Sequence, residues 1–337
     1  MPNGLTVLVT GGTGSFGHAF LPYALNNFDI DRIIVFSRDE MKQWEMQKKF
    51  GDDRRVRFFL GDIRNRDRVY RAVDGVDIVV HAAAMKIVRA AEYNPFEAVQ
   101  TNVIGAMNLI DACIDRGVSK VVALSTDKAS NPVSLYGATK LASDKLFIAG
   151  NSYAGKKATR FSVVRYGNVM GSRGSVIPLF MDRLEAGLPL QINDEKMTRF
   201  MISLDQGVKT VGHAIHDMVG GETYVRKAPS MKVTEIARAL NPGAEYEVVG
   251  IQPGEKLHEQ MIGEVDAPHT YEYEDYYKIL PTINLWDRSV DMIGEGKKVS
   301  EGFNYVSDTN DVWMTHDELL AWVDNYREEY SNRPRNS

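Results

Sequence analysis

The order of apolar and polar positions in the first half of the chain predicts strands that alternate with helices. Short runs rich in valine and isoleucine end in glycine or polar residues, and a longer segment with helical spacing follows each run. The predicted strands are Leu5–Thr10, Arg32–Phe36, Val56–Leu60, Val76–Val80, Val121–Leu124 and Arg160–Arg165, and the longest predicted helices are Pro95–Arg116 and Tyr136–Tyr153. Such alternation over residues 1–166 is typical of an α/β fold with a doubly wound parallel sheet.

The second half has a less regular pattern and predicts a smaller α/β part, residues 167–330, that is interleaved with the first. A loop over Gly167–Pro178 is followed by short elements. They are helices at Met181–Ala186, Asp205–Val219, Thr234–Ala239 and Thr315–Tyr330, a short strand pair within Gln191–Arg199, and strands at Thr223–Arg226 and Tyr246–Val249. We interpret Tyr271–Tyr277 as a solvated segment with packed tyrosines and residues 331–337 as a frayed tail.

Composition narrows the class of protein. The 337 residues are 44% hydrophobic and 25% charged, and the net charge of −5 gives no general attraction to nucleic acid or anionic lipid. Cys113 is the only cysteine, so we expect it to pack inertly and exclude intrachain disulfides and cysteine-rich metal sites. No apolar run reaches the ~18 residues of a membrane span, and Leu5–Val9 is a strand rather than a leader. We therefore expect a soluble, cytoplasmic protein.

A glycine motif follows the first strand. Gly11, Gly14 and Gly17 form G-x-x-G-x-x-G between a predicted strand and a predicted helix. Glycine lets the backbone approach a pyrophosphate, which the N–H groups of a helix N-terminus bind. This context predicts a dinucleotide site rather than a plain glycine-rich turn. Its expected residues are Gly11, Thr13, Gly14, Ser15, Phe16 and Gly17.

The end of the second strand indicates which dinucleotide binds. It carries Ser37 and Arg38, where a site for NAD usually has an acidic residue for the ribose 2′-hydroxyl. A hydroxyl and a cation favour the 2′-phosphate of NADP, and Lys42 can add to the same site. The alternative is that Arg38 only pairs with Asp39 or Glu40 on the surface.

Two later strand ends supply further candidates. Asp62 and Ile63 follow the third strand, and Asp62 either brackets the adenine or caps the next helix. Small residues after the fourth strand allow a cofactor close to the backbone, and Lys86 is a candidate for the nicotinamide side or the substrate pocket. These small residues are Ala82, Ala83 and Ala84.

Two polar residues are expected to have structural contacts. His81 ends the fourth strand, and we expect it to be packed and hydrogen-bonded rather than catalytic. Asn102 lies inside a predicted helix, where asparagine is unfavourable, so we expect a buried hydrogen bond to hold it.

Residues 125–140 carry the most chemistry. Tyr136 and Lys140 lie one helical turn apart on one face, so the lysine favours the phenolate of a tyrosine whose ordinary pKa is about 10. Thr126, Asp127 and Lys128 follow the fifth strand, at the edge where open α/β sheets bind ligands. The segment offers a hydroxyl, an acid, an amine and an activated phenol, which is more than a hydride transfer requires.

These motifs together resemble the extended short-chain dehydrogenase/reductase superfamily, through the nucleotide loop Thr10–Gly17, Asn102, and the Tyr136 and Lys140 pair. Over nearly the whole chain, further segments are similar to the inverting UDP-N-acetylglucosamine 4,6-dehydratases of pseudaminic acid biosynthesis. They are Ser125–Ala129, Asn131–Pro132, Leu135–Lys140, Ala91–Pro95, Arg165–Val169, Pro253–Lys256 and Ser307–Asp311. The resemblance implies a Rossmann-type NADP-binding domain over residues 1–166 that carries the catalytic residues and contacts the cofactor also through Asn102, Tyr136 and Lys140. It implies that residues 167–330 mainly bind the substrate.

The resemblance also implies a reaction cycle without net redox change. Tyr136 takes the proton of the 4-hydroxyl, with Thr126 hydrogen-bonded to the same oxygen, while carbon 4 gives a hydride to tightly held NADP. Lys128 removes the proton on carbon 5, Asp127 protonates the departing 6-hydroxyl, and hydride returns to carbon 6. A proton then returns to the opposite face of carbon 5. The implied product is UDP-2-acetamido-2,6-dideoxy-β-L-arabino-hexos-4-ulose.

These roles require particular protonation states. Lys128 must be neutral, and we expect the positive charge of Lys140 and of the nicotinamide to lower its pKa. Asp127 must be protonated, which burial favours. The alternative for this pair is a turn with solvated charges. The expected contacts of the uridine diphosphate and sugar are Lys86, Asn168, Val169, Arg173, Ser175, Val176, Thr198, Arg199, Met201, Glu255 and Lys256.

Three related enzyme classes and one noncatalytic role are alternatives to this function. The dTDP-glucose dehydratases pair Asp with Glu where this chain has Asp127 and Lys128, and the membrane-anchored dehydratases that retain the carbon-5 configuration lack the tyrosine. A UDP-sugar 4-epimerase shares Tyr136 and Lys140 but needs no acid–base pair at 127–128. A noncatalytic NADP-binding sensor needs none of these four side chains.

Two residues depart from the family pattern, and the family suggests an assembly. Met85 and Arg89 stand where leucine and proline are expected. Methionine for leucine is nearly volume-neutral, whereas Arg89 changes a subunit contact or the edge of the pocket. The family suggests a homodimer through the helices around 95–116 and 136–153, assembled further into a hexamer.

Overall fold

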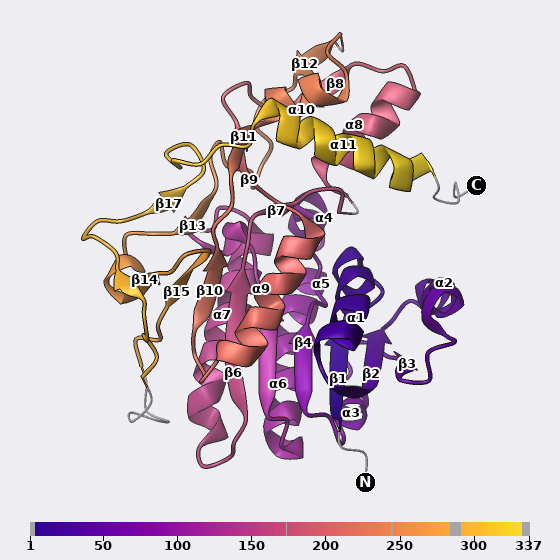
Figure 1. Cartoon of the computed structure of the whole chain (residues 1–337), viewed down its shortest axis with the longest axis vertical. Coiled ribbons are helices and arrows are strands. Elements are labelled where there is room, and N and C mark those ends of the chain that lie inside the picture. Colours follow the sequence, from indigo (N-terminus) through magenta and orange to yellow (C-terminus); the bar gives the residue numbers. More distant parts are fainter. Residues whose placement is uncertain (1–3, 173, 244, 284–290, 332–337) are drawn as a thin grey trace.

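The structure is a computed structural model that describes residues 4–172, 174–243, 245–283 and 291–331. Its centre is a ten-stranded sheet in the order β16-β14-β15-β10-β6-β5-β4-β1-β2-β3 (Figure 1). The strands are β1 Leu5–Thr10, β2 Ile30–Ser37, β3 Val56–Leu60, β4 Ile78–His81, β5 Lys120–Leu124, β6 Arg160–Arg165, β10 Thr223–Arg226, β14 Thr270–Glu272, β15 Tyr276–Ile279 and β16 Lys297–Lys298. From β10 to β3 all neighbours are parallel, and the last three strands add antiparallel pairs at one edge. The predicted doubly wound, Rossmann-type sheet is confirmed.

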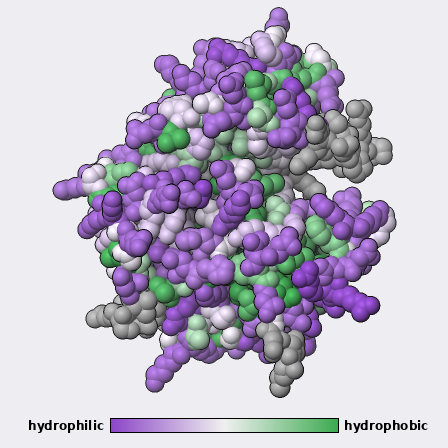
Figure 2. Space-filling view, in the orientation of Figure 1, coloured by the Kyte–Doolittle hydropathy of each residue, from purple (hydrophilic) through white to green (hydrophobic). Residues whose placement is uncertain are grey.

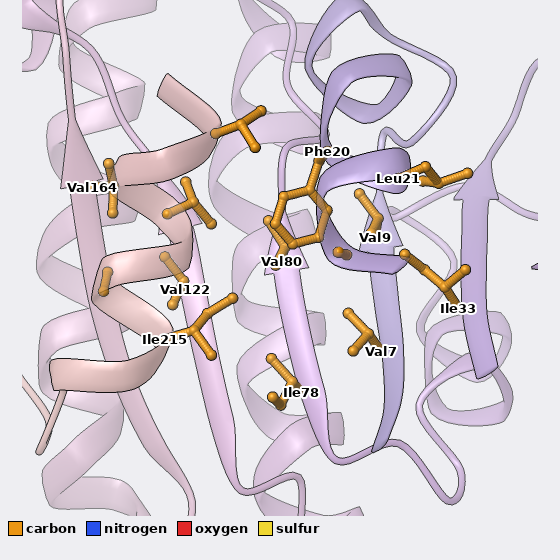
Figure 3. Packing of buried hydrophobic residues seen from close by; sticks show 14 of the residues in the cluster. Val7, Val9, Phe20, Leu21, Ile33, Ile78, Val80, Val122, Val164 and Ile215 are labelled. Atoms are coloured by element: carbon orange, nitrogen blue, oxygen red, sulfur yellow. The ribbon is translucent and has the colours of Figure 1, made fainter. Parts of the chain in front are cut away.

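Both faces of the sheet are covered by helices, because side chains alternate along each strand. Val7 and Val9 face α1 (Ser15–Asn27), α2 (Glu40–Phe50) and α9 (Leu204–Asp217), whereas Leu8 faces the opposite layer. Figure 3 shows Phe20 and Leu21 of α1 and Ile215 of α9 packed on this first face. The opposite layer consists of α3 Arg66–Ala72, α6 Gly105–Arg116 and α7 Leu135–Ala154. Cys113 lies buried in it, and burial raises the pKa of its thiol, so its predicted inert packing is confirmed.

Polar residues fix the starts of several helices. Asp39 accepts a hydrogen bond from the N–H of Lys42, Ser134 caps α7, and Ser203 forms a capping box with Gln206 in α9. Asn65 caps α3 through the N–H of Arg68. The cap of α3 is therefore Asn65, and the alternative role of Asp62 as this cap is wrong.

The helix predicted over Pro95–Arg116 is not one regular α-helix. It consists of α5 (Pro95–Val99), a π-helical turn η1 (Gln100–Ile104) and α6, and a short α4 (Val88–Tyr93) precedes it. A π turn carries an extra residue in the helical register. This turn contains Asn102.

The second part of the chain lies at the carboxyl ends of the parallel strands and has a core of its own (Figure 1). Its helices α8 Val176–Glu185, α10 Val233–Leu240 and α11 His316–Ser331 pack together around Phe180, Ile236 and Leu319. Small sheets join β11-β9-β7, β12-β8 and β13-β17. Their strands are β7 Asn168–Val169, β8 Leu190–Ile192, β9 Thr198–Ile202, β11 Ser230–Lys232, β12 Tyr246–Val248, β13 Gln260–Ile262 and β17 Tyr305–Val306. This part also contains the short 3-10 turn η3 Ala267–His269, and a similar turn, η2 Asp127–Ala129, follows β5 in the first part.

Two expectations for this part were wrong in detail, and a third was right but incomplete, because the tyrosines of Tyr271–Tyr277 are packed as expected but lie in strands. The strands within 191–199 do not pair with each other, because β8 pairs with β12 and β9 pairs with β7 and β11. Helix α8 begins at Val176, inside the segment expected to be a loop. The segment Tyr271–Tyr277 contributes to the antiparallel strands β14 and β15, in which Tyr277 is buried against Phe200 and Tyr305. The alternation of apolar and polar residues that predicts a strand is short in this segment, and the acidic residues between the tyrosines obscure it.

Segments of the second part return to the large sheet. Strand β10 lies beside β6, and α9 packs against α1 on the first face. The face in Figure 2 is mostly hydrophilic, with apolar residues in small separate patches. None of the helices in the described ranges is long and apolar enough to cross a membrane. Of the tail, residues 332–337 lie outside the described residues.

Candidate active site

The loop between β1 and α1 has the geometry of a nucleotide cradle. Gly11 has φ +64°, and a Cβ on it would lie 2.7 Å from the backbone of Ala83. A Cβ on Gly17 would lie 1.9 Å from the carbonyl oxygen of Gly12. Glycine is therefore required at both positions. Gly14 precedes α1 and leaves the helix N-terminus without a side-chain cap, which is the arrangement that binds phosphate. Thr13 is buried, Ser15 begins the helix, and Phe16 stacks on Phe20.

The residues expected to contact the 2′-phosphate lie together after β2. Ser37 is buried and accepts a hydrogen bond from Gln43, whereas the Arg38 side chain is exposed. Arg38 lies 3.7 Å from Asp62, and Lys42 lies 2.9 Å from Asp39. The surface partner of Arg38 is thus Asp62 and not Asp39 or Glu40. Asp62 also binds Arg64, and the Ile63 side chain is buried.

The loop after β4 lies against the glycine loop. The N–H of Ala82 donates to the carbonyl oxygen of Thr10, and that of Ala83 donates to its hydroxyl. His81 accepts or donates at 2.7 Å to the same hydroxyl and packs on Phe147. Burial lowers the pKa of His81 to about 3, so its predicted packed, hydrogen-bonded role is confirmed. Ala84 and Lys86 are exposed further along the loop.

Asn102 ties this loop to the helix that carries Tyr136. Its side chain accepts from the N–H of Met85 at 2.8 Å and donates to the Met85 carbonyl oxygen and the Thr139 hydroxyl, both at 3.0 Å. The expected buried hydrogen bond of Asn102 is confirmed. Met85 therefore contributes backbone contacts, while Arg89 is exposed on α4.

The catalytic candidates meet at the carboxyl end of β5. Asp127 is fully buried in η2, and its Oδ1 accepts from the hydroxyl of Thr126 at 2.8 Å and from Nζ of Lys128 at 3.1 Å. Tyr136 is buried at the start of α7, and its hydroxyl is hydrogen-bonded to the Thr126 side chain. Asp127 Oδ2 is buried and has no hydrogen-bond partner. The interpretation of Asp127 and Lys128 as a solvated turn is wrong.

The charges around Tyr136 and Lys140 differ from the expectation. Nζ of Lys140 donates to the carbonyl oxygen of Leu124 at 2.7 Å, and burial lowers its pKa. Burial raises the pKa of Tyr136 to about 12, and the charge that opposes this most is that of Lys128. The spacing predicts that Lys140 favours the phenolate of Tyr136, but the charge that favours it most is that of Lys128.

The expected lowering of the pKa of Lys128 is also wrong. Burial lowers this pKa, but the two carboxylates of Asp127 and Glu259 outweigh it and raise it. Lys128 is thus an ammonium group held between two acids. Burial raises the pKa of Asp127, and the negative charge of Glu259 adds to this effect, as the acid role requires.

Two buried acids of the site were missed. Glu259 lies immediately after the segment Gln252–His258, and its Oε1 lies 3.0 Å from Nζ of Lys128. Asp144 lies one helical turn beyond Lys140 and accepts from the hydroxyl of Ser125 at 2.6 Å. The i, i+4 spacing of Lys140 and Asp144 was a usable signal. No local pattern connects Glu259 with Lys128, because 131 positions separate them.

One group of predicted substrate residues lies around β7 and α8. Asn168 and Val169 form β7, and Asn168 is paired with Met201 of β9. Oδ1 of Asn168 and Oγ of Ser175 are buried and have no hydrogen-bond partner, and Val176 begins α8. The N–H of Asp127 donates to the carbonyl oxygen of Tyr166. This bond brings the start of β7 close to residues 125–130 after β5, which we call the catalytic loop. Arg173 lies outside the described residues.

A second group contacts protein atoms. Thr198 is hydrogen-bonded to His258 and Ser307. Arg199 is buried and donates to backbone carbonyl oxygens, including that of Lys256. Lys256 donates to the carbonyl oxygen of Ser130 at 2.7 Å, and Glu255 accepts from Asn193. Arg199 thus ties residues 256–259 to β9, and Lys256 ties them to Ser130, which directly follows η2.

Comparisons with known proteins show which family the chain belongs to. A family model described as "Polysaccharide biosynthesis protein" matches residues 7–281. A UDP-N-acetylglucosamine 4,6-dehydratase (inverting) of Campylobacter jejuni is 53% identical over 326 residues, which cover 95% of this chain and 97% of that protein. A UDP-glucose 4-epimerase of Rickettsia canadensis is 41% identical over 281 residues, or 81% of this chain and 82% of the epimerase.

Solved structures show the same fold. Pen from Bacillus thuringiensis is 35% identical, with a TM-score of 0.88 over 97% of this chain and 99% of that chain. DesIV, a dTDP-glucose 4,6-dehydratase from Streptomyces venezuelae with NAD and TYD bound, is 26% identical, with a TM-score of 0.67 over 75% of this chain and 87% of that chain.

Proposed function

The chain belongs to the polysaccharide biosynthesis protein family and, within the extended short-chain dehydrogenases/reductases, to the inverting UDP-N-acetylglucosamine 4,6-dehydratases, and on this premise we propose that it dehydrates UDP-N-acetylglucosamine. The proposed product is UDP-2-acetamido-2,6-dideoxy-β-L-arabino-hexos-4-ulose, a first step toward pseudaminic acid or a related 6-deoxy amino sugar. The observation that supports it most is the buried cluster of Thr126, Asp127, Lys128 and Tyr136 at the carboxyl end of β5.

The protein has the residues to hold a nicotinamide dinucleotide. The glycine cradle, which a Cβ on Gly11 or Gly17 would fill, suits the pyrophosphate. Arg38 and Lys42 lie where a 2′-phosphate would bind, and we propose NADP on that basis. When bound, the nicotinamide supplies reversible hydride transfer between carbon 4 and carbon 6.

The hydroxyl groups serve the oxidation at carbon 4. Tyr136 accepts the proton of the 4-hydroxyl, and Thr126, hydrogen-bonded to Tyr136, holds the same oxygen. Because burial raises the pKa of Tyr136, the phenol needs additional positive charge to act as a base. Lys128 provides part of it in this structure.

The acid and the amine serve the elimination. The proton on Lys128 moves to Asp127 across their 3.1 Å contact, which leaves a neutral amine and a carboxylic acid. The amine then takes the proton of carbon 5, the electrons of that bond form the carbon 5–carbon 6 double bond, and the hydroxyl on carbon 6 leaves as water with the proton of Asp127. A charged pair thereby becomes the base and acid that the reaction needs.

The second part of the chain is proposed to hold the UDP-sugar. Asn168 in β7 and Ser175 before α8 carry buried oxygen atoms without partners, and β7 lies beyond the carboxyl ends of the parallel strands (Figure 1). Such atoms cost free energy unless a ligand or water satisfies them. Arg199 contributes by fixing residues 256–259 against β9, and Lys256 contributes by fixing them to Ser130 beside the catalytic residues.

The proposed homo-oligomer is supported by exposed apolar residues on the helices expected at the subunit contact. Phe96 is 83% exposed, and Met107 and Tyr153 are also exposed. Where exposed apolar side chains form one continuous patch, they are typical of an interface. Whether a dimer or a hexamer forms is decided by sedimentation of the purified protein.

A 4-epimerase is the second candidate, since several relatives bear the name UDP-glucose 4-epimerase. An epimerase needs Tyr136 but not a buried acid–amine pair, so Asp127 and Lys128 favour dehydration. A noncatalytic sensor would leave the side chains of Asp127, Lys128, Tyr136 and Lys140 without a role.

Proton NMR of the protein with UDP-N-acetylglucosamine in heavy water separates these functions. Dehydration gives a new methyl signal, deuterium at carbon 5 and L-arabino coupling constants, and Lys128→Met abolishes all three. Formation of UDP-N-acetylgalactosamine would instead establish epimerisation. An unchanged spectrum with added NADP would contradict both activities on this substrate and would point to another nucleotide sugar or to the sensor.

A further inference from the structure

Glu259 is a buried acid that neither the motifs nor the proposed roles account for. Its side chain is 1% exposed, and it stands just before β13, far from Lys128 in sequence. Burying a carboxylate costs several kcal/mol unless it is well paired. A buried carboxylate beside the catalytic loop must therefore be paired with positively charged side chains.

Three cations surround this carboxylate. Its Oε1 lies 3.0 Å from Nζ of Lys128 and 3.8 Å from Nε of Arg199, and its Oε2 lies 4.0 Å from Nζ of Lys256. Burial raises the pKa of Glu259, but these charges, led by that of Lys128, outweigh it and lower the pKa. Glu259 is thus an anion, and its shortest contact is with the catalytic amine.

The backbone of Glu259 is fixed independently of its side chain. Its N–H donates to the hydroxyl of Ser307 at 2.9 Å, and its carbonyl oxygen accepts from the N–H of Ser307 at 2.8 Å. Ser307 is fully buried and extends the pairing of β13 with β17. The carboxylate is therefore presented to Lys128 by a rigid support, and replacing only the carboxylate leaves that support intact.

Lys128 needs such a support because its side chain is long and flexible. With Asp127 alone, the amine can rotate about a single contact. Between Asp127 at 3.1 Å and Glu259 at 3.0 Å, it is held at two points. Two fixed contacts define the position from which it would approach carbon 5.

We propose that Glu259 is a positioning residue of the elimination step, holding the Lys128 amine against Asp127 so that a proton can pass between them. This inference rests on the proposed dehydratase function. The proton leaves Lys128 for Asp127, the neutral amine takes the proton of carbon 5, and Asp127 gives its proton to the leaving hydroxyl. Glu259 keeps its charge throughout, balanced by Arg199 and Lys256.

The test compares Glu259→Gln with the wild type and with Glu264→Gln, an exposed glutamate five residues further on that undergoes the same change. Because a misplacement of about 1 Å can cost on the order of 100-fold, we expect Glu259→Gln to lower kcat by on the order of 100-fold. We expect KM to change little. Glu259→Asp, which keeps the charge but shortens the side chain, should retain more activity than Glu259→Gln, and Glu264→Gln should match the wild type.

A substrate deuterated at carbon 5 shows which step is affected. In Glu259→Gln we expect a large kinetic isotope effect on kcat, since removal of the carbon-5 proton becomes rate limiting. A slowed variant with an isotope effect near one would overturn the proposal, as would a Glu259→Gln enzyme with wild-type kcat. Thermal melts verify folding, and Glu259→Asp gives a second folded variant if Glu259→Gln does not fold. Absence of the methyl product with the wild type would overturn the proposed function, and the inference with it.

Discussion

Replacing Asn102 by alanine should destabilise the protein, because the loop after β4 would lose the hydrogen bonds that Asn102 makes to it from the neighbouring helix. Asn102 is 1% exposed and makes three side-chain hydrogen bonds, two of them to the backbone of Met85. The substitution leaves the N–H and carbonyl groups of Met85 without this partner. At about 1 kcal/mol net for each hydrogen bond, the expected loss is about 3 kcal/mol.

The loss can be measured by urea unfolding monitored through tryptophan fluorescence, since the chain has four tryptophans. For a chain of this length, a loss of about 3 kcal/mol corresponds to a fall in Tm of about 4 °C. Asn27→Ala is the matched control, because Asn27 is exposed and donates only to the carbonyl oxygen of Tyr23. We expect the control to change stability by less than about 0.5 kcal/mol.

A second variant tests the assignment of the bonds. Asn102→Asp keeps the acceptor for the N–H of Met85 but loses both donors, and it buries a negative charge at neutral pH. It should be less destabilised at pH 4 than at pH 7, relative to the wild type. If Asn102→Ala costs no more than Asn27→Ala, the contacts with Met85 do not stabilise the fold and the reasoning is refuted.

Three further outcomes follow from the geometry. Tyr136→Phe should lower kcat by about 100-fold or more with little change in Tm, because only the hydroxyl is lost, whereas Tyr153→Phe at an exposed position should be neutral in the same NMR assay. Gly11→Ala should abolish retention of the nicotinamide cofactor, because the added Cβ would collide with the backbone of Ala83. Cofactor content and calorimetric titration measure this loss. In the control, Gly75→Ala, the residue also has positive φ but open space around it, so this variant should bind the cofactor normally. His81, whose pKa falls from 6.5 to about 3 on folding, binds its proton more tightly in the unfolded chain. Its stabilising contribution is complete above pH 6.5 and is lost as the pH falls toward 3, so acidification to pH 5 should cost about 2 kcal/mol less in His81→Gln than in the wild type.

Much of the fold could be predicted because the strands of the large sheet read as short apolar runs, and central ones such as Arg160–Arg165 are buried on both faces. Val56–Leu60 and Arg160–Arg165 have the predicted bounds. The π turn around Asn102 could not be predicted, since it spans only Gln100–Ile104, which is too short to show a period of its own. Strand pairing in the second part depends on distant segments, such as β12 for β8, which local patterns do not specify.

The catalytic loop was predictable because its residues are close in sequence, whereas their charge states were not. Local spacing suggested that Lys140 would control Tyr136 and Lys128. The pKa of Lys128 instead depends on Glu259, which approaches from another part of the chain. Electrostatic effects follow distances in space, and a distance of 3.0 Å across 131 positions leaves no periodic signal.

The position of β10 in the sheet has a consequence for synthesis on the ribosome. Strands β1 to β6 come from residues 5–165, but the neighbour of β6 on its other side is β10, at residues 223–226. At 5–20 residues per second, the roughly 60 residues between them take about 3–12 s to translate. During that time β6, which is almost wholly buried in the finished protein, is an unpaired apolar edge on the nascent chain. We expect chaperones that bind nascent chains to act in this interval, and slowing translation after residue 165 to increase aggregation.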